Sequence, residues 1–586
     1  MAQFTRVGSR IADLDGFMGT VRFIGSVASS SSLESTYYGV EWDDHSRGKN
    51  DGSVIAKSDS SSWKAGDLVR HFNCTANGGD LSTAGSFLKI PEPLKEGGKK
   101  KKKKKAPTIN FGTGLFSVLS TRYAEESDPL ITDKETKQFL EGDCYAQTKQ
   151  GKGRKKKIEF HGEEKLRDRQ QVDQVDAVAV RSSFISYVES DYDVTQFSHL
   201  TELDVMGNLL SDWTEVFRIL RTLKCITKFH LNGNLLNDIN EIFNALSAED
   251  RATTLFPNLK VLVVNSVNIK DGYKTLVTFS KMFPNLKELY LARNSFGDLG
   301  EAAETELEVS QMGDVVGAFA DANLPPPPGA PDTKTTPALF PNLTLIDLSA
   351  CGLSSWESQV ALLSRIAPKI DTLILNDNTI PNIPKCSEPS PSSKLNLNLE
   401  QQETFPNLHS LQLSGNSLTS WASIDNLNSY KLSSLRFGRN PITKNIGGSE
   451  SRSITIARIG SLKVLNSSNV EGRERSEAEK RYLRVVMREL SNKERDCASK
   501  EIARSEVSLA HPRFAGLSVV HAAAMQAMSG GIAAGSEQSG SSMASDTLNV
   551  TITSLASASC TQEPCTKRLP GSLTVASLRS MCKVSL

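Results

Sequence analysis

The sequence lacks the features that would place it in a membrane or in a secretory pathway. No apolar run approaches the roughly 20 residues that a membrane-spanning helix needs. Residues 1–6 have no apolar stretch typical of a secretory signal. The nine cysteines are scattered and odd in number, so they do not suggest a disulfide framework. We therefore expect a soluble protein of the reducing cytoplasm.

Signatures of catalysis are also missing. The sequence has no phosphate-binding Gly-x-x-x-x-Gly-Lys-Ser/Thr loop, no His-Glu-x-x-His and no Gly-x-Ser-x-Gly. Only Cys560 and Cys565 lie close together, and no second pair supplies the other ligands of a zinc site. The 68 basic residues balance 67 acidic ones, so overall charge indicates no class of partner. An enzyme is the poorer interpretation, and we expect no cofactor or metal ion.

What is present begins with short strands and glycine turns over residues 1–94. Because a single core rarely grows past about 250 residues, a chain of 586 should hold several domains. Within the first, the segment 48–52 reads Gly-Lys-Asn-Asp-Gly and follows an aromatic strand, 37–42. Glycine lets a backbone approach closely, while Lys49 adds charge and Asn50 adds both a donor and an acceptor. This suits a ligand ending in a carboxylate, although an ordinary hairpin turn would use the same residues.

Five blocks of this segment, in order, resemble a CAP-Gly domain. They are Gly-Thr-Val-Arg-Phe-Ile-Gly, Tyr-Tyr-Gly-Val-Glu-Trp, Gly-Lys-Asn-Asp-Gly, His-Phe-Asn-Cys and Gly-Ser-Phe-Leu. The resemblance implies binding of acidic C-terminal tails that end Glu-Glu-Tyr, as on α-tubulin. It implies that the tail is held by the turn and by aromatic walls, comprising Gly48, Lys49, Asn50, Asp51, Gly52, Phe23, Tyr37, Trp42 and Phe72. One departure is an extra stretch, 55–67, which we expect to form a surface loop.

Residues 95–170 read as a basic linker with a short helix at 115–123. Seven consecutive lysines, 99–105, and a second cluster at 151–157 cannot pack and should stay solvated. They could form a variable linker, contact nucleic acid, or attract the acidic tail that the groove captures. No aromatic residues interleave them, which argues against nucleic acid as a partner.

A nine-residue pattern, Leu-x-x-Leu-x-Leu-x-x-Asn, recurs through residues 171–502. This period is typical of leucine-rich repeats, in which stacked turns bury apolar side chains and asparagines bond backbone across turns. The asparagine position is occupied by Asn208, Asn234, Asn294, Asn378, Asn416 and Asn440, with Val267 and Cys351 as substitutes. We expect an α/β solenoid that binds a protein, sealed by a charged helix at 471–502; a scaffold that only spaces the ends is the alternative.

The last residues combine a linker with an incomplete domain. Residues 503–546 include an Ala-, Gly- and Ser-rich stretch and should be flexible. In 547–586, a strand, a hairpin loop, a return strand and a helix resemble the first half of a ubiquitin-like α+β domain. A piece of this size is marginal by itself.

The predicted fold class is therefore multidomain: a small β barrel-like CAP-Gly module, an α/β solenoid and a partial α+β terminus. In this order the modules resemble those of the tubulin-folding cofactors. The resemblance implies a cytoplasmic, cytoskeleton-associated chaperone that binds α-tubulin and works with cofactors D and C, with B as a further candidate partner. The alternatives are a CAP-Gly adaptor on assembled microtubules and a nucleic-acid-associated repeat protein.

Overall fold

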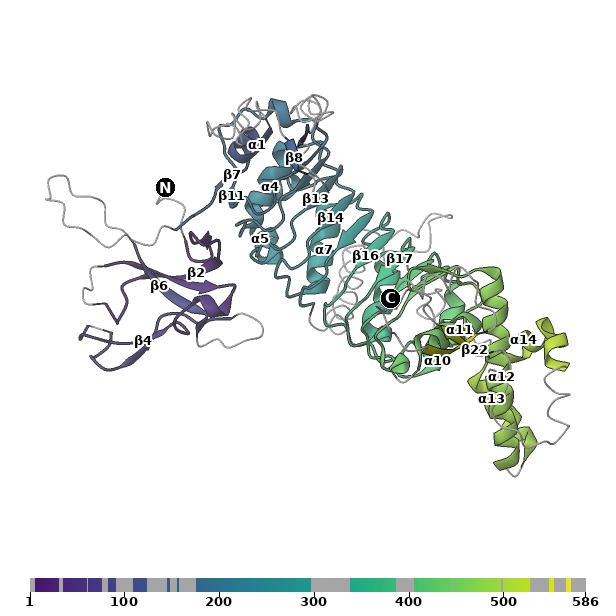
Figure 1. Ribbon diagram of the computed structural model, residues 1–586. Coiled ribbons are helices and arrows are strands. Elements are labelled where there is room, and N and C mark those ends of the chain that lie inside the picture. The colour runs from purple at the N-terminus through teal and green to yellow at the C-terminus, as the bar shows by residue number, and fades with distance from the viewer. Residues whose placement is uncertain are drawn as a thin grey trace, which may run out of the picture. The chain divides into compact units, whose positions relative to one another are not determined.

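The computed structural model (Figure 1) describes the chain in separate stretches. These are residues 6–30, 35–60, 62–75, 83–90, 109–123, 145–147, 155–157, 175–296, 338–385, 405–444, 446–496, 499–526, 547–552 and 565–570. Residues 1–479 form one compact unit and residues 480–586 a second. Among the described helices, none combines the length and the apolar character that crossing a membrane requires.

The N-terminal module is a four-stranded antiparallel sheet in the order β1-β2-β3-β6. The strands are β1 Arg10–Ala12, β2 Met18–Gly25, β3 Tyr37–Trp42 and β6 Gly85–Lys89, with a separate hairpin of β4 Ser53–Ile55 and β5 Leu68–Arg70. Side chains alternate between the two faces of a strand. One face accordingly buries a core of Ile11, Val21, Tyr38, Val40 and Trp42. The predicted small β module is confirmed.

A short connector follows this sheet. Asn110 bridges to Ala12, and the Phe111 ring meets the Tyr38 ring edge-on with a centroid distance of 5.6 Å. β7 Thr113–Gly114 then pairs with β11 Ile185–Tyr187, and helix α1 Leu115–Tyr123 buries Leu115, Phe116 and Leu119. The predicted short helix is thus present. Lysine run 99–105 lies outside the described residues, whereas 155–157 form β9, which pairs with β8 Tyr145–Gln147.

The repeats build an eleven-stranded sheet that is parallel from β10 to β20 and ends in an antiparallel strand, β21. Its strands are β10 Ala177–Ala179, β12 Glu202–Asp204, β13 Lys228–His230, β14 Val261–Val263, β15 Glu288–Tyr290, β16 Leu345–Asp347, β17 Thr372–Ile374, β18 Ser410–Gln412, β19 Ser434–Arg436, β20 Val464–Leu465 and β21 Ser468–Asn469. The middle residue of each three-residue strand in this sheet is buried, as Leu203 and Phe229 illustrate. The predicted solenoid is confirmed.

Helices lie between several of the successive strands in the described part of the repeats (Figure 1). They are α4 Trp213–Thr222, α5 Ile239–Ala245, α6 Ala248–Ala252, α7 Gly272–Met282, α9 Ala361–Ile366, α10 Trp421–Asn426 and α11 Gly448–Arg458. Shorter helical turns lie at Thr195–Phe197, Trp356–Val360, Leu427–Tyr430 and Pro441–Thr443, and another lies in the N-terminal module at His45–Arg47. Several helices begin at a capping side chain; Asp212, for example, accepts a hydrogen bond from Thr214 N.

Buried asparagines join neighbouring repeats, as the sequence pattern predicts. Asn294 Nδ2 donates to Leu291 O of its own repeat at 2.7 Å and to Val264 O of the preceding one at 2.9 Å. Its Oδ1 accepts the amides of Val267 and Ile269. Cys351 takes the same position, and its thiol lies 3.3 Å from Leu291 O. Each asparagine therefore pairs backbone groups that would otherwise be buried without partners.

Helices continue beyond the predicted boundary near residue 502. α12 runs Gly472–Asp496, and it is followed by α13 Lys500–Ala510 and α14 Phe514–Val520. The first part of the predicted flexible linker, 503–546, is therefore helical, because Ala503 and Val507 supply a buried face. Strands β22 Thr547–Ile552 and β23 Cys565–Pro570 pair antiparallel, as the sequence predicts for the two strands, while the ubiquitin-like fold of this region stays a prediction. The predicted helix after residue 574 lies outside the described residues.

Candidate functional site

The segment 48–52 is clamped to strand β6 by its backbone. Lys49 N and Asn50 N both donate to Gly85 O, at 2.6 and 3.1 Å, and Gly85 N donates back to Asn50 O at 2.5 Å. Asn50 Oδ1 accepts the amide of Gly52 at 3.0 Å. The asparagine amide group therefore has a fixed orientation, and Lys49 is carried at an exposed position beside it.

Both glycines that flank this turn are required by close backbone approach. A Cβ on Gly48 would collide with Thr83 O. A Cβ on Gly52 would collide with Phe72 O, and Gly52 also has a φ of +89°, which L side chains rarely adopt. The predicted turn residues Gly48 and Gly52 thus shape the site through the backbone and offer no side chain to a ligand.

The turn carries two charged side chains, Lys49 and Asp51, which differ in their ion-pair partners. Arg70 pairs with Asp51 at 2.7 Å, and Asp51 Oδ1 accepts the amide of Ser53. Burial opposes ionisation of Asp51, but the bonds from Ser53 and Arg70 outweigh it and lower the pKa of this carboxyl. Asp51 therefore stabilises the turn, and its contact with a ligand stays a prediction. Within the described residues, no ion pair of the Lys49 ammonium is found.

Aromatic rings gather on the sheet face opposite the core. Gly39 of β3 lies between Phe23 of β2 and Phe87 of β6 in the strand register. The missing side chain leaves room for the Phe72 ring, whose centroid is 5.4 Å from that of Phe87. Phe23 and Phe72, predicted from the sequence, thus lie together, and Phe87 is a third ring that was not predicted.

His71 and Trp63 extend this aromatic cluster and were also missed. The His71 ring lies 4.9 Å from Phe23 and 5.4 Å from Phe87, between centroids. Trp63 meets His71 edge-on at 5.7 Å. His71 Nε2 accepts the amide of Ala28 at 3.1 Å, and burial lowers the pKa of the imidazole. His71 is therefore a neutral ring that joins the cluster to the segment around Ala28.

The extra stretch 55–67 does more than form the predicted surface loop. It connects β4 and β5 as a hairpin, and Lys57 N donates to Ala28 O at 2.9 Å. Trp63, which lies inside the stretch, supplies the contact with His71. A tryptophan in an otherwise polar, serine-rich insertion was the available signal that it packs against the module.

Two predicted wall residues have different roles. Trp42 is 1% exposed and belongs to the core, where the Arg47 guanidinium lies 5.2 Å from its ring centre. The prediction that Trp42 forms an open wall is wrong, because alternation along β3 sends Trp42 and Gly39 to opposite faces. Tyr37 does lie on the aromatic face at half-buried depth, and its hydroxyl is 3.1 Å from Ser30 Oγ.

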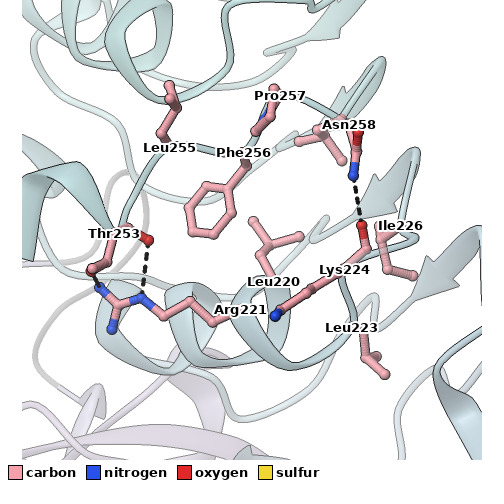
Figure 2. A pocket seen from close by; sticks show the side chains of 11 residues that line it. Leu220, Arg221, Leu223, Lys224, Ile226, Thr253, Leu255, Phe256, Pro257 and Asn258 are labelled. Atoms are coloured by element: carbon pink, nitrogen blue, oxygen red, sulfur yellow. Dashed lines mark hydrogen bonds between the residues drawn. The ribbon is translucent and has the colours of Figure 1, made fainter.

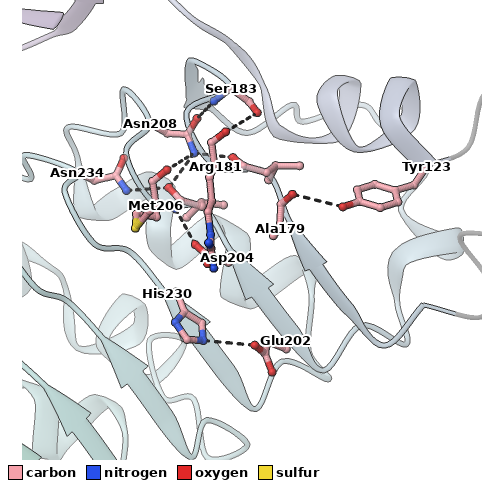
Figure 3. Close-up of polar contacts among 12 residues, drawn as sticks. Tyr123, Ala179, Arg181, Ser183, Glu202, Asp204, Met206, Asn208, His230 and Asn234 are labelled. Carbon is pink, nitrogen blue, oxygen red and sulfur yellow. Dashed lines mark hydrogen bonds and ion pairs between the residues drawn. The ribbon is translucent and has the colours of Figure 1, made fainter. Parts of the chain in front are cut away.

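The outward strand face of the first repeats is polar and charged (Figure 3). Arg181 pairs with Asp204 at 2.6 Å, and Lys228 pairs with Glu202 at 3.2 Å. His230 Nε2 lies 3.5 Å from the other oxygen of Glu202. The opposite charges within each pair compensate, so this face presents both signs of charge to a partner and has no strong field of one sign.

Comparisons with known proteins agree with this arrangement. Residues 7–90 match the CAP-Gly domain family. Tubulin-folding cofactor E of Arabidopsis thaliana is 25% identical over 579 residues, which span 98% of this chain and 88% of that protein. This chain resembles tubulin-specific chaperone E. The proteins of that name from Danio rerio and Bos taurus are each 25% identical and cover 98% and 88% of this chain.

The similarity to tubulin-specific chaperone E extends over both modules, since it spans 89% of the Danio rerio protein as well. Among solved structures, a leucine-rich-repeat protein of Leptospira interrogans is 18% identical over 53% of this chain and 60% of its own, with a TM-score of 0.27.

Proposed function

We propose that this protein is a non-enzymatic tubulin chaperone that holds α-tubulin by its acidic C-terminal tail in the aromatic groove. The observation that carries the proposal is an exposed Lys49 on a turn fixed by Gly85, directly beside the ring face around Gly39. The names of the similar proteins, tubulin-folding cofactor E and tubulin-specific chaperone E, support tubulin as the protein that is bound.

In this proposal the ligand's charge and its last ring are recognised separately. The Lys49 ammonium attracts the terminal carboxylate, and the Asn50 amide donates from a position fixed by its bond with Gly52. The tail's aromatic side chain packs on the half-buried rings of Phe23 and Phe87. Because His71 is neutral and uncharged within this face, the slot stays apolar where the ring enters.

The repeats would supply a second, weaker contact. Their outward strand face carries paired charges that would contact the folded body of tubulin. The tail would remain bound in the groove. Linking two weak sites raises the overall affinity through effective concentration, by about 10²-fold or more when both sites bind at the same time. On this account the chain acts in the cytoplasm during assembly or dismantling of the αβ heterodimer, with cofactors D and C, and B as a further candidate, as partners.

The test compares wild type with Asn50→Ala on soluble tubulin. Gel filtration should show a complex for wild type and a weaker one for the variant, because the groove loses the Asn50 amide while the repeats still bind. Asn244→Ala, which changes an exposed asparagine of helix α5, is the matched surface control. Equal complex formation by wild type and Asn50→Ala would refute the groove assignment.

The alternative is an adaptor on assembled microtubules that uses the same groove. Co-sedimentation separates the two proposals. An adaptor pellets with polymer, whereas a chaperone stays in the supernatant with soluble tubulin or reduces the amount of polymer.

A further inference from the structure

A cleft of about 460 Å³ lies on the helix side of the repeats, far in sequence from the groove (Figure 2). It opens between the C-terminal end of α4 and the segment 253–259 of the next repeat. Its buried floor is apolar and consists of Leu220, Leu223, Ile226, Phe256 and Leu259. The volume is within the range of clefts that bind ligands, about 300–1,000 Å³.

The cleft lies in a repeat that is longer than the repeats on either side of it. Asn234 and Val267 are 33 positions apart, whereas Asn208 and Asn234 are 26 apart. The added length holds helix α6, Ala248–Ala252, which leads directly into the segment 253–259. The repeat therefore departs from its neighbours at the place where the cleft opens.

Two basic side chains stand at the rim. Arg221 Nε donates to Thr253 O at 3.2 Å and its terminal nitrogen to Thr253 Oγ1 at 2.8 Å, which holds the guanidinium over the opening. Lys224 is exposed, and its carbonyl accepts from Asn258 Nδ2 at 3.0 Å, which ties the two walls together. The residues that line the cleft include no carboxylate.

An exposed apolar side chain completes the rim. Leu255 is 51% exposed, although its neighbour Phe256 is buried in the floor. A leucine that is half exposed beside an apolar cleft offers apolar surface that a bound partner could bury favourably. The combination is a positive rim over an apolar floor, and it complements a negatively charged segment with an apolar side chain.

We propose that this cleft binds an acidic peptide segment of a partner protein that inserts one bulky apolar side chain. The inserted side chain packs on Phe256 and Leu255, and flanking carboxylates pair with Arg221 and Lys224. Such a segment needs no free C-terminus, which distinguishes this site from the aromatic groove.

The experiment uses the full chain and a labelled peptide, acetyl-Glu-Glu-Leu-Phe-Glu-Glu-amide, in fluorescence anisotropy. Its blocked C-terminus removes the carboxylate that the groove would recognise. Lys224→Glu should weaken binding by about tenfold or more, since it places like charges together. Lys281→Glu, an exposed lysine on α7, should change it by less than about twofold. Lys49→Ala should have no effect.

A second pair of variants tests the apolar contact. Leu255→Ser should weaken binding severalfold, whereas Leu235→Ser, another exposed leucine at 37%, should not. Acetyl-Lys-Lys-Leu-Phe-Lys-Lys-amide should bind much more weakly than the acidic peptide. The proposal is overturned if wild type does not bind the acidic peptide, if Lys224→Glu and Leu255→Ser leave affinity unchanged, or if Lys49→Ala abolishes it. Unchanged affinity in Lys224→Glu and Leu255→Ser would leave the groove proposal standing, because that proposal is tested with a free-acid tail.

Discussion

The Phe72 ring lies directly over Gly39: a Cβ built on Gly39 would come within 2.6 Å of Phe72 Cε1. It would also come within 2.9 Å of Phe23 Cβ. The aromatic face therefore depends on the absence of a side chain at the middle of strand β3. Gly39→Ala should push Phe72 out of place, lower tail-peptide affinity by about tenfold and reduce stability by about 1–3 kcal/mol.

Isothermal titration calorimetry and urea unfolding would measure these two effects. Gly438→Ala is the matched control, because no atom lies within 4 Å of a Cβ built there. Full tail affinity in Gly39→Ala would show that the face tolerates a methyl group and that Phe72 does not form a wall.

The neutral state of His71 predicts a pH dependence. Burial lowers the pKa of this imidazole below its ordinary value of 6.5, and Nε2 already accepts the amide of Ala28. Because the unfolded chain binds the proton more readily, the contribution of His71 is fully present above about pH 6.5. It is lost as pH falls through the lowered folded-state pKa. The unfolding free energy should therefore decrease as pH falls below about 6.5.

NMR titration of the imidazole gives the direct measurement. In His71→Gln, whose side-chain oxygen can still accept from Ala28, the decrease in stability with pH should be smaller. A folded-state pKa at or above 6.5 would contradict the neutral assignment.

The contact between Trp63 and His71 predicts that the insertion contributes to binding. Trp63→Ala removes an edge-on aromatic pair, a contact that is ordinarily worth about 0.5–1.5 kcal/mol. Tail affinity should fall by about two- to tenfold, with Lys64→Ala, an exposed neighbour, as the control. Equal affinities for the two variants, measured by fluorescence anisotropy, would show that the insertion is a surface loop that does not contribute to tail binding.

The asparagine ladder predicts large and position-specific losses of stability. Asn294→Ala leaves Val264 O, Leu291 O and two amides without the side chain that pairs them. Unfolding free energy should fall by about 2–4 kcal/mol, as expected when buried polar groups lose their partners. Asn382→Ala, at an exposed position, should change it by less than about 0.5 kcal/mol. Comparable losses in urea titrations of both variants would argue against the ladder.

Two kinds of feature can be predicted from the sequence: the regularly spaced residues of the repeats and the residues that a tight turn requires. The spacing of leucines and asparagines locates nearly every strand of the sheet, and the two glycines around Lys49 locate the turn. It does not predict which face of β3 each aromatic residue occupies, since that depends on the register with β2 and β6. Trp42 was misplaced for this reason. His71, Phe87 and Trp63 were missed because they come from separate segments that meet only in the folded module.

The most direct measurement compares two peptides that end Glu-Glu-Tyr, one with a free C-terminal carboxylate and one with an amide. Wild type should bind the free acid about tenfold or more tightly than the amide, because Lys49 and the Asn50 amide recognise the terminal charge. In Lys49→Ala the two peptides should bind almost equally weakly. Equal binding of both peptides by wild type would contradict capture of a carboxylate tail in this groove.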